Sequence, residues 1–311
     1  MTNSPATAHA QASACAKIIL CGEHAVVYGR PAIALPISHL RTRATVAPGS
    51  GPFRICAPDI HAEFDLSTDP TRPLSIVARR TFEYLGQPPA PAVLTVKSDI
   101  PPSSHLGSSA SVAVAGARAI AAYCGSALPP ADASRLAFEA EKIYHGSPSG
   151  IDNTVIAYEQ PVWFVRTPEE PQIVVVEAPR PCLVIGDTGI VTPTRVPVGD
   201  VRRAWEAQPA RYEDLFDQIA AVVAGARAAL LAGDWPRLGQ WLNANHALLQ
   251  SLGVSCSELD QLCAAALQAG ALGAKMSGGG RGGNMIALAR DEQHAGELRA
   301  ALRTAGAARV L

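Results

Sequence analysis

The segment SASVAVAGARAIAAYC, residues 109–124, constrains the fold of this chain most strongly. It is rich in alanine and apolar nearly all round, which is typical of a helix that is buried on every side. The stretch leading into it, IPPSSHLGSSASV at residues 100–112, places two prolines and several serines around one glycine. The sequence therefore predicts a buried helix that begins at a polar, glycine-containing turn.

A helix of this kind needs a sizeable core around it, and the chain is long enough to supply one. It has 311 residues, of which 48% are hydrophobic and 17% charged, so it is globular, and its length suggests about two domains. Strand and helix patterns are mixed without strict βαβα repetition, which favours an α+β fold. A proline-punctuated zone at 160–181 separates a predicted N-terminal domain, 1–180, from a C-terminal domain, 181–311.

Periodicity and turn residues predict the individual elements. Strands are expected at 15–20, 31–37, 42–47, 53–57, 92–99 and 182–189, with 42–47 and 53–57 paired around the turn PGSG. Helices are expected at 74–86, 109–124, 132–145, 200–232, 235–251, 255–270 and 291–305. Asp132 or Ser134 is the expected cap of one helix, and Ser255 with Glu258 forms a capping box at another. The stretch KMSGGGRGGNMIALA predicts a glycine-rich turn leading into a strand.

Charge and cysteine content exclude several classes of function. The net charge is −1, which gives no electrostatic footprint for nucleic acid. Seven scattered cysteines without a C-x-x-C pair predict free, mostly buried thiols and no structural metal site. The N-terminus lacks the features of a signal peptide, and no uninterrupted apolar run is long enough to span a bilayer. We therefore expect a cytoplasmic protein without membrane or nucleic-acid partners.

The turn before residue 109 has the properties of a phosphate-binding site. A helix N-terminus exposes backbone N–H groups and the positive end of the helix dipole. Gly107 lets an anion approach the backbone closely, and the hydroxyls of Ser108 and Ser109 add ligands for phosphate or magnesium. The alternative is a plain serine cap on a buried helix. The Walker A pattern, protein-kinase signatures, G-x-S-x-G and H-E-x-x-H are absent from the sequence.

Other residues favour phosphoryl transfer once they are taken together with this turn. Lys17 supplies a cation, and Glu141 and Asp152 supply carboxylates on either side of the loop GSPSG. Phosphoryl transfer uses a cation to offset charge, a carboxylate and a hydroxyl for magnesium, and a carboxylate at the acceptor hydroxyl. Each residue has an ordinary alternative: a surface lysine, a solvated helix glutamate, an aspartate helix cap and, for His24, a hydrogen-bonded structural histidine. A Lys17–Asp152 contact in the folded protein would favour the functional interpretation.

Six stretches of the sequence resemble one known family. AKIILCGEHAVVYGRPAIALPI, IPPSSHLGSSASV, EKIYHGSPSGIDNTV, DTGIVTPTR, LGVSCSELDQL and AKMSGGGRGGNMIAL closely resemble the mevalonate kinases of the GHMP kinase superfamily, in the family's order. The resemblance implies a ribosomal protein S5 domain 2-like N-terminal domain, a ferredoxin-like C-terminal domain and an active site in the cleft between them. It also implies transfer of the ATP γ-phosphate to the 5-hydroxyl of (R)-mevalonate, which gives 5-phosphomevalonate and ADP for isoprenoid precursor synthesis.

The resemblance also implies roles for individual residues. Asp152 matches the family's catalytic aspartate, which either orients the acceptor hydroxyl or accepts its proton, and Lys17 matches the lysine that pairs with it. Glu141 and Ser109 match magnesium ligands. The positions implied near mevalonate are Glu23, His24, Gly150 and Thr194. The positions implied to bind the phosphates of ATP are Pro102, Ser103, Ser104, Leu106, Gly107, Ser108, Ser109, Ala110, Gly278, Gly279 and Gly280. Relatives are often dimers, so a homodimer is a further expectation.

Two loops depart from the family pattern. Ser104 and His105 stand where many relatives have small residues, and the late loop reads GGGRGG where GAGGGG is common, so Arg281 either touches a phosphate or points to solvent. Three alternative functions are also open: another GHMP kinase such as phosphomevalonate kinase, a mevalonate 3-kinase or ATP-dependent decarboxylase, and a binding module without turnover. A phosphorylated acceptor should require more Lys or Arg around its pocket.

Overall fold

The computed structural model describes residues 9–101, 104–145 and 148–311. By compactness the described chain divides into two units. The first unit contains the residues up to Lys17 together with Pro36–Glu159, and the second contains Ile18–Leu35 together with Gln160–Leu311. Strands β1 (Ala10–Cys21) and β2 (Pro31–Pro48) therefore contribute residues to both units. The domain bounds 1–180 and 181–311 stay a prediction, because compact units in space need not coincide with domains defined along the sequence.

The strands of the first unit show that the predicted hairpin of 42–47 with 53–57 is wrong. Strand β5 (Ala92–Ser98) lies between β2 and β3 (Arg54–Ala57), antiparallel to the first and parallel to the second, and β4 (Ala62–Asp65) pairs with the outer edge of β3. With 7 residues against 4 in β3, β5 offers β2 the longer hydrogen-bonded ladder. The turn PGSG reverses the chain direction but does not decide the pairing partner.

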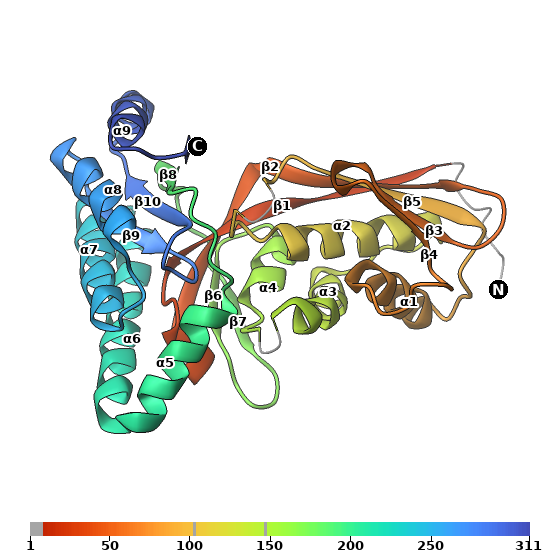
Figure 1. The fold of residues 1–311 in the computed structure, drawn as a ribbon, viewed down its shortest axis with the longest axis horizontal. Helices are drawn as coiled ribbons and strands as arrows, with labels where there is room; N and C mark the ends of the chain where they lie inside the picture. The colour runs from red at the N-terminus through yellow and green to blue at the C-terminus, as the bar shows by residue number, and fades with distance from the viewer. Residues whose placement is uncertain (1–8, 102–103, 146–147) are drawn as a thin grey trace. The chain divides into compact units, whose positions relative to one another are not determined.

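The helices of the first unit lie on one side of its strands (Figure 1). They are α1 (Pro73–Leu85), α2 (Ser108–Tyr123), α3 (Pro130–His145) and α4 (Ile151–Tyr158). Helix α2 contacts α1, α3, α4 and β5, so its burial on nearly all sides is confirmed. The predicted caps of α3 are wrong: the helix begins at Pro130, and a proline fits that first turn because no helical hydrogen bond needs its missing N–H.

The second unit combines a four-stranded antiparallel sheet with a bundle of helices. The sheet has the order β11 (Arg309–Val310), β8 (Leu183–Asp187), β10 (Asn284–Leu288), β9 (Gly273–Ser277), and the glycine-rich turn joins β9 to β10 as predicted. Strand β6 (Val162–Val165) pairs with residues 31–34 of β2 and with β7 (Gln172–Val175). The helices are α5 (Arg195–Ala207), α6 (Pro209–Ala232), α7 (Trp235–Ser251), α8 (Ser257–Gln268) and α9 (Glu292–Thr304).

Two predictions for these helices are wrong in detail. The single helix expected at 200–232 is broken at Gln208, where φ is −138°, and α6 starts at Pro209. The capping box is not formed: α8 begins at Ser257 after Cys256, and the hydroxyl of Ser255 donates to Asp260 instead. The start of α8 was thus placed two residues early, at Ser255 and not at Ser257, and the break before α6 was not expected.

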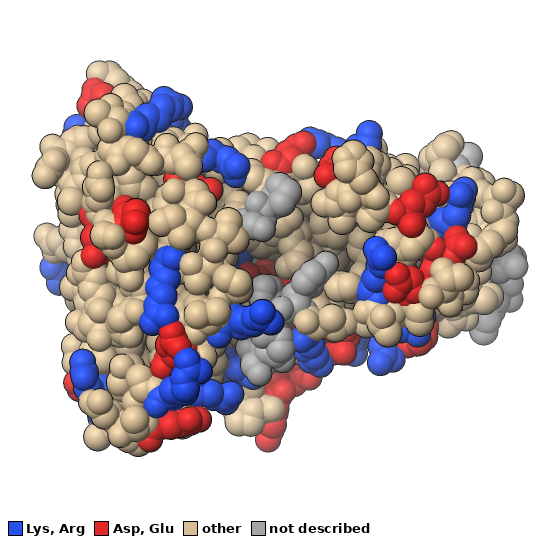
Figure 2. Space-filling model, viewed as in Figure 1, with Lys and Arg blue, Asp and Glu red and all other residues tan. Residues whose placement is uncertain are grey.

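Helix α6 is long and apolar enough, by length and composition alone, to cross a membrane. A core helix of a soluble protein meets the same criterion, and α6 has a buried stripe (Tyr212, Phe216, Ile219, Val223, Leu230) opposite an exposed face that is polar in the first half of the helix and mostly alanine in the second. Its closest packing partner is α7. On the face shown in Figure 2, positive and negative side chains are intermixed. The expected absence of membrane and nucleic-acid partners stays a prediction.

All seven cysteines are free thiols, as their spacing predicts. Cys15, Cys21 and Cys263 are buried and the other four are partly exposed, so the expectation of mostly buried thiols is only partly confirmed. Burial raises the pKa of Cys15 and of Cys263 to about 12. These two thiols are therefore packing residues and not nucleophiles.

Candidate active site

The predicted contact between Lys17 and Asp152 is confirmed. Lys17 on β1 is 4% exposed, which excludes a surface lysine, and its Nζ lies 3.0 Å from Oδ2 of Asp152 in the first turn of α4. The backbone N–H of Lys17 donates to the carbonyl of Leu106 at 2.9 Å, so β1 is attached to the turn that leads into α2. The cap of α4 is Gly150 and not Asp152, which leaves the carboxylate of Asp152 to its lysine partner.

The turn at the start of α2 packs directly against the stem of Lys17. Gly107 caps α2 with φ 78°, and a Cβ atom there would lie 2.8 Å from both Lys17 Cγ and Ile156 Cδ1. Only glycine fits this position, because any side chain would displace the lysine. Ser108, Ser109 and Ala110 follow as the first turn of α2, whose backbone N–H groups lack partners within the helix.

Glu141 on α3 belongs to the same group of residues. It is 2% exposed, so the solvated alternative is wrong. Burial raises the pKa of Glu141 to about 7; a hydrogen bond from Ser109 opposes this shift, Asp152 adds to it and Lys17 opposes it. Glu141 is thus a buried carboxyl whose pKa is raised further by a nearby carboxylate. A divalent cation bound there would favour the ionised form, so the arrangement is suited to a metal ion.

The oxygen ligands in this unit suit magnesium. Two carboxylates and the Ser109 hydroxyl are close enough to influence one another. Within 9–101, 104–145 and 148–311, no cluster of three or more His, Cys, Asp or Glu residues is arranged to hold a metal. Magnesium is commonly held by one or two carboxylates and by substrate phosphates, and this ligand set meets that requirement.

The remaining phosphate positions differ in how far they can be placed. Pro102 and Ser103 lie outside the described residues. Ser104 and Leu106 are buried beside the turn, and His105 between them has φ 57°, a conformation that costs energy for a side chain other than glycine. The turn therefore has an unusual backbone at His105 as well as at Gly107.

A second group of predicted residues gathers in the other unit. His24 is 5% exposed, and its Nε2 lies 3.0 Å from the carbonyl oxygen of Gly279. Burial lowers the pKa of His24 to about 4, so the ring is neutral at physiological pH. Because a carbonyl only accepts, Nε2 carries the proton and Nδ1 is left as an acceptor for a ligand hydroxyl. Thr194 lies against Gly279, since a Cβ on that glycine would be 3.1 Å from Thr194 Cγ2.

Lys275 is the residue that sequence reasoning missed. It lies on β9, is 0% exposed, and forms an ion pair with Glu23, which is itself 1% exposed. The other carboxylate oxygen, Glu23 Oε2, is buried without a hydrogen-bond partner among the described residues. A ligand hydroxyl would satisfy it. The signal was a lysine inside the apolar strand that precedes the glycine loop, because an isolated charge in a core strand requires a partner.

Part of the glycine loop at 278–283 packs against, and hydrogen-bonds to, other protein groups. A Cβ on Gly280 would lie 2.0 Å from the carbonyl oxygen of Val254, and Gly280 has φ 83°. The N–H groups of Arg281 and Gly283 donate to protein carbonyls. The guanidinium of Arg281 pairs with Asp200 and reaches the carbonyl of Gly253. Within this unit the side chain of Arg281 is therefore held by protein groups. These contacts explain its position without a phosphate contact and without a side chain that points freely to solvent.

Replacing Gly107 by Ala should displace the Lys17 side chain and lower kcat by roughly tenfold, because misplaced catalytic groups lose rate steeply. Gly86→Ala is the matched control: Gly86 ends α1 with φ 64°, and nothing lies within 4 Å of a Cβ there. Both variants should lose about 1 kcal/mol of stability from the left-handed backbone. Equal kcat values for the two variants would contradict the close packing of Gly107 on Lys17.

Two family models match the chain in agreement with this geometry. The N-terminal domain of GHMP kinases matches residues 73–160, which include α2, Glu141 and Asp152, and the C-terminal domain of GHMP kinases matches residues 226–308, which include β9 and the glycine loop. The class of protein is thus that of the GHMP kinases.

Curated relatives and solved structures define the family more narrowly. The chain is 36% identical to a mevalonate kinase of Thermococcus sibiricus, over 95% of this chain and 93% of the relative. It is 35% identical to a mevalonate kinase of Pyrococcus furiosus, over 95% and 93%. The crystal structure of L. major mevalonate kinase in complex with R-mevalonate matches with a TM-score of 0.85 and 30% identity, covering 100% of this chain and 97% of that one. The chain therefore belongs to the mevalonate kinase family of the GHMP kinases. It is an ATP-dependent phosphotransferase with an alcohol acceptor.

Proposed function

We propose that this chain transfers the γ-phosphoryl group of ATP to the 5-hydroxyl of (R)-mevalonate, giving 5-phosphomevalonate and ADP. The observation that carries the proposal is the ion pair between buried Lys17 and partly exposed Asp152, beside the glycine-capped N-terminus of α2. It is supported by the names of the relatives and by the similarity to a structure of L. major mevalonate kinase with R-mevalonate.

The residues have distinct tasks in this reaction. The 5-hydroxyl oxygen attacks the γ-phosphorus, the bond from that phosphorus to the β,γ-bridging oxygen breaks, and ADP departs with the bond electrons. In this proposal Asp152 orients the hydroxyl or accepts its proton, and the ammonium of Lys17, 3.0 Å from the Asp152 carboxylate, offsets negative charge on the transferred group. Ser108, Ser109 and Ala110 offer the N–H groups of the first turn of α2 to phosphate oxygens.

The acceptor is proposed to bind through the second group of residues. Glu23 Oε2 and His24 Nδ1 each accept a hydrogen bond from a hydroxyl, and Thr194 supplies a hydroxyl beside Gly279. Gly150, the cap of α4 in the first unit, is a further acceptor position that the resemblance implies.

Magnesium is proposed as the cofactor of ATP, held by Glu141 and Ser109. When bound, it neutralises charge on the phosphate oxygens. Replacing Glu141 by Gln should raise the magnesium concentration that gives half-maximal activity on the order of tenfold. Glu139→Gln is the control, because Glu139 is on the same helix and its carboxylate binds Lys142. Identical magnesium titrations for the two variants would count against this ligand.

The pKa of Glu141 gives a prediction for the metal-free protein. The pKa of about 7 lies above the usual 4.5, so the stability from this group is fully present below pH 4.5 and is lost as the pH rises through 7. The free energy of unfolding of Glu141→Gln, relative to that of the parent protein, should therefore increase by on the order of 3 kcal/mol between pH 5 and pH 8. Thermal unfolding in chelator across this range measures it; parallel curves for the two proteins would contradict the burial effect.

The experiment that tests the function is a substrate panel in a coupled ADP assay. Mevalonate should be the preferred acceptor over 5-phosphomevalonate, galactose and homoserine, and phosphorus NMR should place the phosphate on the 5-oxygen without release of carbon dioxide. Preference for 5-phosphomevalonate, phosphate on the 3-oxygen, or carbon dioxide release would each replace the proposal with another kinase or with a decarboxylase. Nucleotide binding without any turnover would identify a binding module.

Location and assembly are further proposals. The resemblance supports a cytoplasmic enzyme and a homodimer. Size-exclusion chromatography with light scattering measures the mass in solution against the 32.4 kDa of one chain. A single-chain mass would refute the dimer and leave the proposed reaction unaffected.

A further inference from the structure

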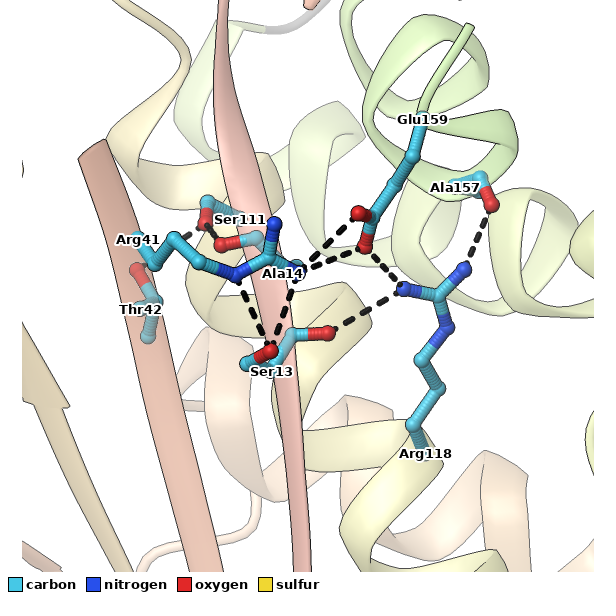
Figure 3. A network of polar contacts seen from close by, with 8 residues as sticks. All are labelled: Ser13, Ala14, Arg41, Thr42, Ser111, Arg118, Ala157 and Glu159. Atoms are coloured by element: carbon cyan, nitrogen blue, oxygen red, sulfur yellow. Dashed lines mark hydrogen bonds and ion pairs between the residues drawn. The ribbon is translucent and has the colours of Figure 1, made fainter. Parts of the chain in front are cut away.

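A polar cluster lies in the first unit, away from the residues assigned above. Glu159 follows the last turn of α4, and its Oε1 accepts from Arg41 on β2 and from Arg118 on α2, each at 2.9 Å (Figure 3). The side chains of both arginines are about three-quarters or more buried. The three residues are called the arginine–glutamate cluster below.

The cluster joins the same elements that carry the proposed catalytic groups. Arg118 Nη1 donates to the carbonyl of Ser13 on β1 at 3.1 Å, and its Nη2 donates to the carbonyl of Ala157 on α4. Arg41 binds the hydroxyl of Ser13 through Nε and Nη2. Strand β1 continues from Ser13 to Lys17, and α4 begins one residue before Asp152. Figure 3 shows these groups converging from β1, β2, α2 and α4.

A second set of contacts extends the attachment along α2. Ser111, one turn from the proposed phosphate site, donates to the carbonyl of Ala14 at 3.0 Å and bonds Thr42 on β2 at 2.9 Å. Ser111 and Arg118 are seven residues apart, two turns of helix, and so lie on one face of α2. Helix α2 is thus fixed to β1 along this face.

The left-handed backbone conformation of Glu159 indicates that this residue does more than end helix α4. Glu159 ends α4 in the left-handed conformation with φ 53°, where glycine is the usual residue. A side chain in that conformation costs on the order of 1 kcal/mol and persists where surrounding contacts hold it. Here the two arginines supply those contacts.

We propose that the arginine–glutamate cluster positions the Lys17–Asp152 pair by fixing the far ends of α4 and β1 to α2. The inference rests on the proposed function, in which that pair acts on the acceptor hydroxyl. Helix α4 is only 8 residues long, so a shift at its end is transmitted to Asp152 at its start. Arg118 is the central positioning residue, since it alone in the cluster contacts β1, α4 and the Glu159 carboxylate.

The test replaces Arg118 by Met, which keeps the length of the side chain and removes its charge and N–H groups. We expect kcat for mevalonate to fall by roughly ten- to a hundredfold, with KM for ATP and mevalonate within about twofold of the parent values. Arg118→Lys should recover part of the loss. Arg43→Met is the matched control, because Arg43 is on the same strand as Arg41 and forms an exposed pair with Asp99. Its kcat should equal that of the parent.

A double-mutant cycle separates positioning from general destabilisation. If Arg118 acts through Asp152, the loss caused by Arg118→Met should shrink to less than about twofold in an Asp152→Asn background. Phe82→Leu, in the core of α1, should lower the melting temperature without changing kcat at temperatures well below melting. A full, undiminished loss in the Asp152→Asn background, or a kcat for Arg118→Met within twofold of the parent, would overturn the proposal.

Glu159→Gly keeps the proposal testable if Arg118→Met does not fold. Glycine relieves the left-handed backbone at Glu159, so a purely structural role predicts unchanged kcat. Positioning predicts a lower kcat in a folded protein, and unchanged turnover would overturn it. A parent protein without kinase activity would refute the proposed function itself, whereas an active parent with a fully active Glu159→Gly variant refutes only the positioning role.

Discussion

Replacing Asp152 by Asn should lower kcat for mevalonate by roughly 10²- to 10⁴-fold, the range expected when a group that moves or holds the acceptor proton is lost. The amide is isosteric, but it neither accepts a proton nor pairs as strongly with the Lys17 ammonium 3.0 Å away. Steady-state kinetics with a coupled ADP assay measures the loss.

Nucleotide binding serves as the internal control for this variant. The proposed phosphate contacts come from the first turn of α2 and not from Asp152, so the Kd for ATP measured by calorimetry should stay within about twofold of the parent value. Asp99→Asn is a matched surface control, because Asp99 pairs with exposed Arg43. Turnover of Asp152→Asn close to that of Asp99→Asn would refute the role of Asp152.

The second large effect is expected from replacing Lys275 by Met. Glu23 and Lys275 are 1% and 0% exposed, so removing the ammonium leaves a buried carboxylate without its counter-charge. Breaking such a pair costs about 3–5 kcal/mol. Chemical denaturation should show this loss, and the remaining protein should bind mevalonate poorly because Glu23 has lost the ammonium that holds its side chain in place.

A double variant shows whether the stability loss comes from the unpaired charge. Lys275→Met combined with Glu23→Leu removes both charges, and buried pairs replaced by apolar residues often keep their stability. The double variant should therefore regain most of the lost stability while mevalonate binding stays weak. If it is as unstable as Lys275→Met alone, the packing of Lys275, and not its charge, is what the fold requires.

The fold could be predicted from the sequence where a signal is local. The burial of α2 follows from its composition, and the turn between β9 and β10 follows from its glycines. Pairing partners are not local: nothing in the residues near 42–47 shows that β5 inserts between β2 and β3. Helix starts were missed where a proline or a competing side-chain bond decides them, as at Pro130 and Ser255.

The same division applies to the candidate site. Lys17, Glu141 and Asp152 were predicted because each stands in a recognisable motif, and their proximity in the first unit follows from the order of β1, α3 and α4 around α2. Lys275 and the arginine–glutamate cluster were not predicted. A buried charge is recognised only together with its partner, and here the partners are far apart in the sequence. Arg118 is 41 residues from Glu159, and Lys275 is 252 residues from Glu23.

The assignment of residues 18–35 to the second unit limits how the gene can be divided or recombined. A polypeptide that starts at Gln160 would lack Glu23, the counter-charge of Lys275, and the stretch of β2 that pairs with β6. An exchange of C-terminal halves between relatives would therefore have to carry this early segment along. Chimaeras that cross over only near residue 160 inherit an unmatched pair wherever the two parents differ at these contacts.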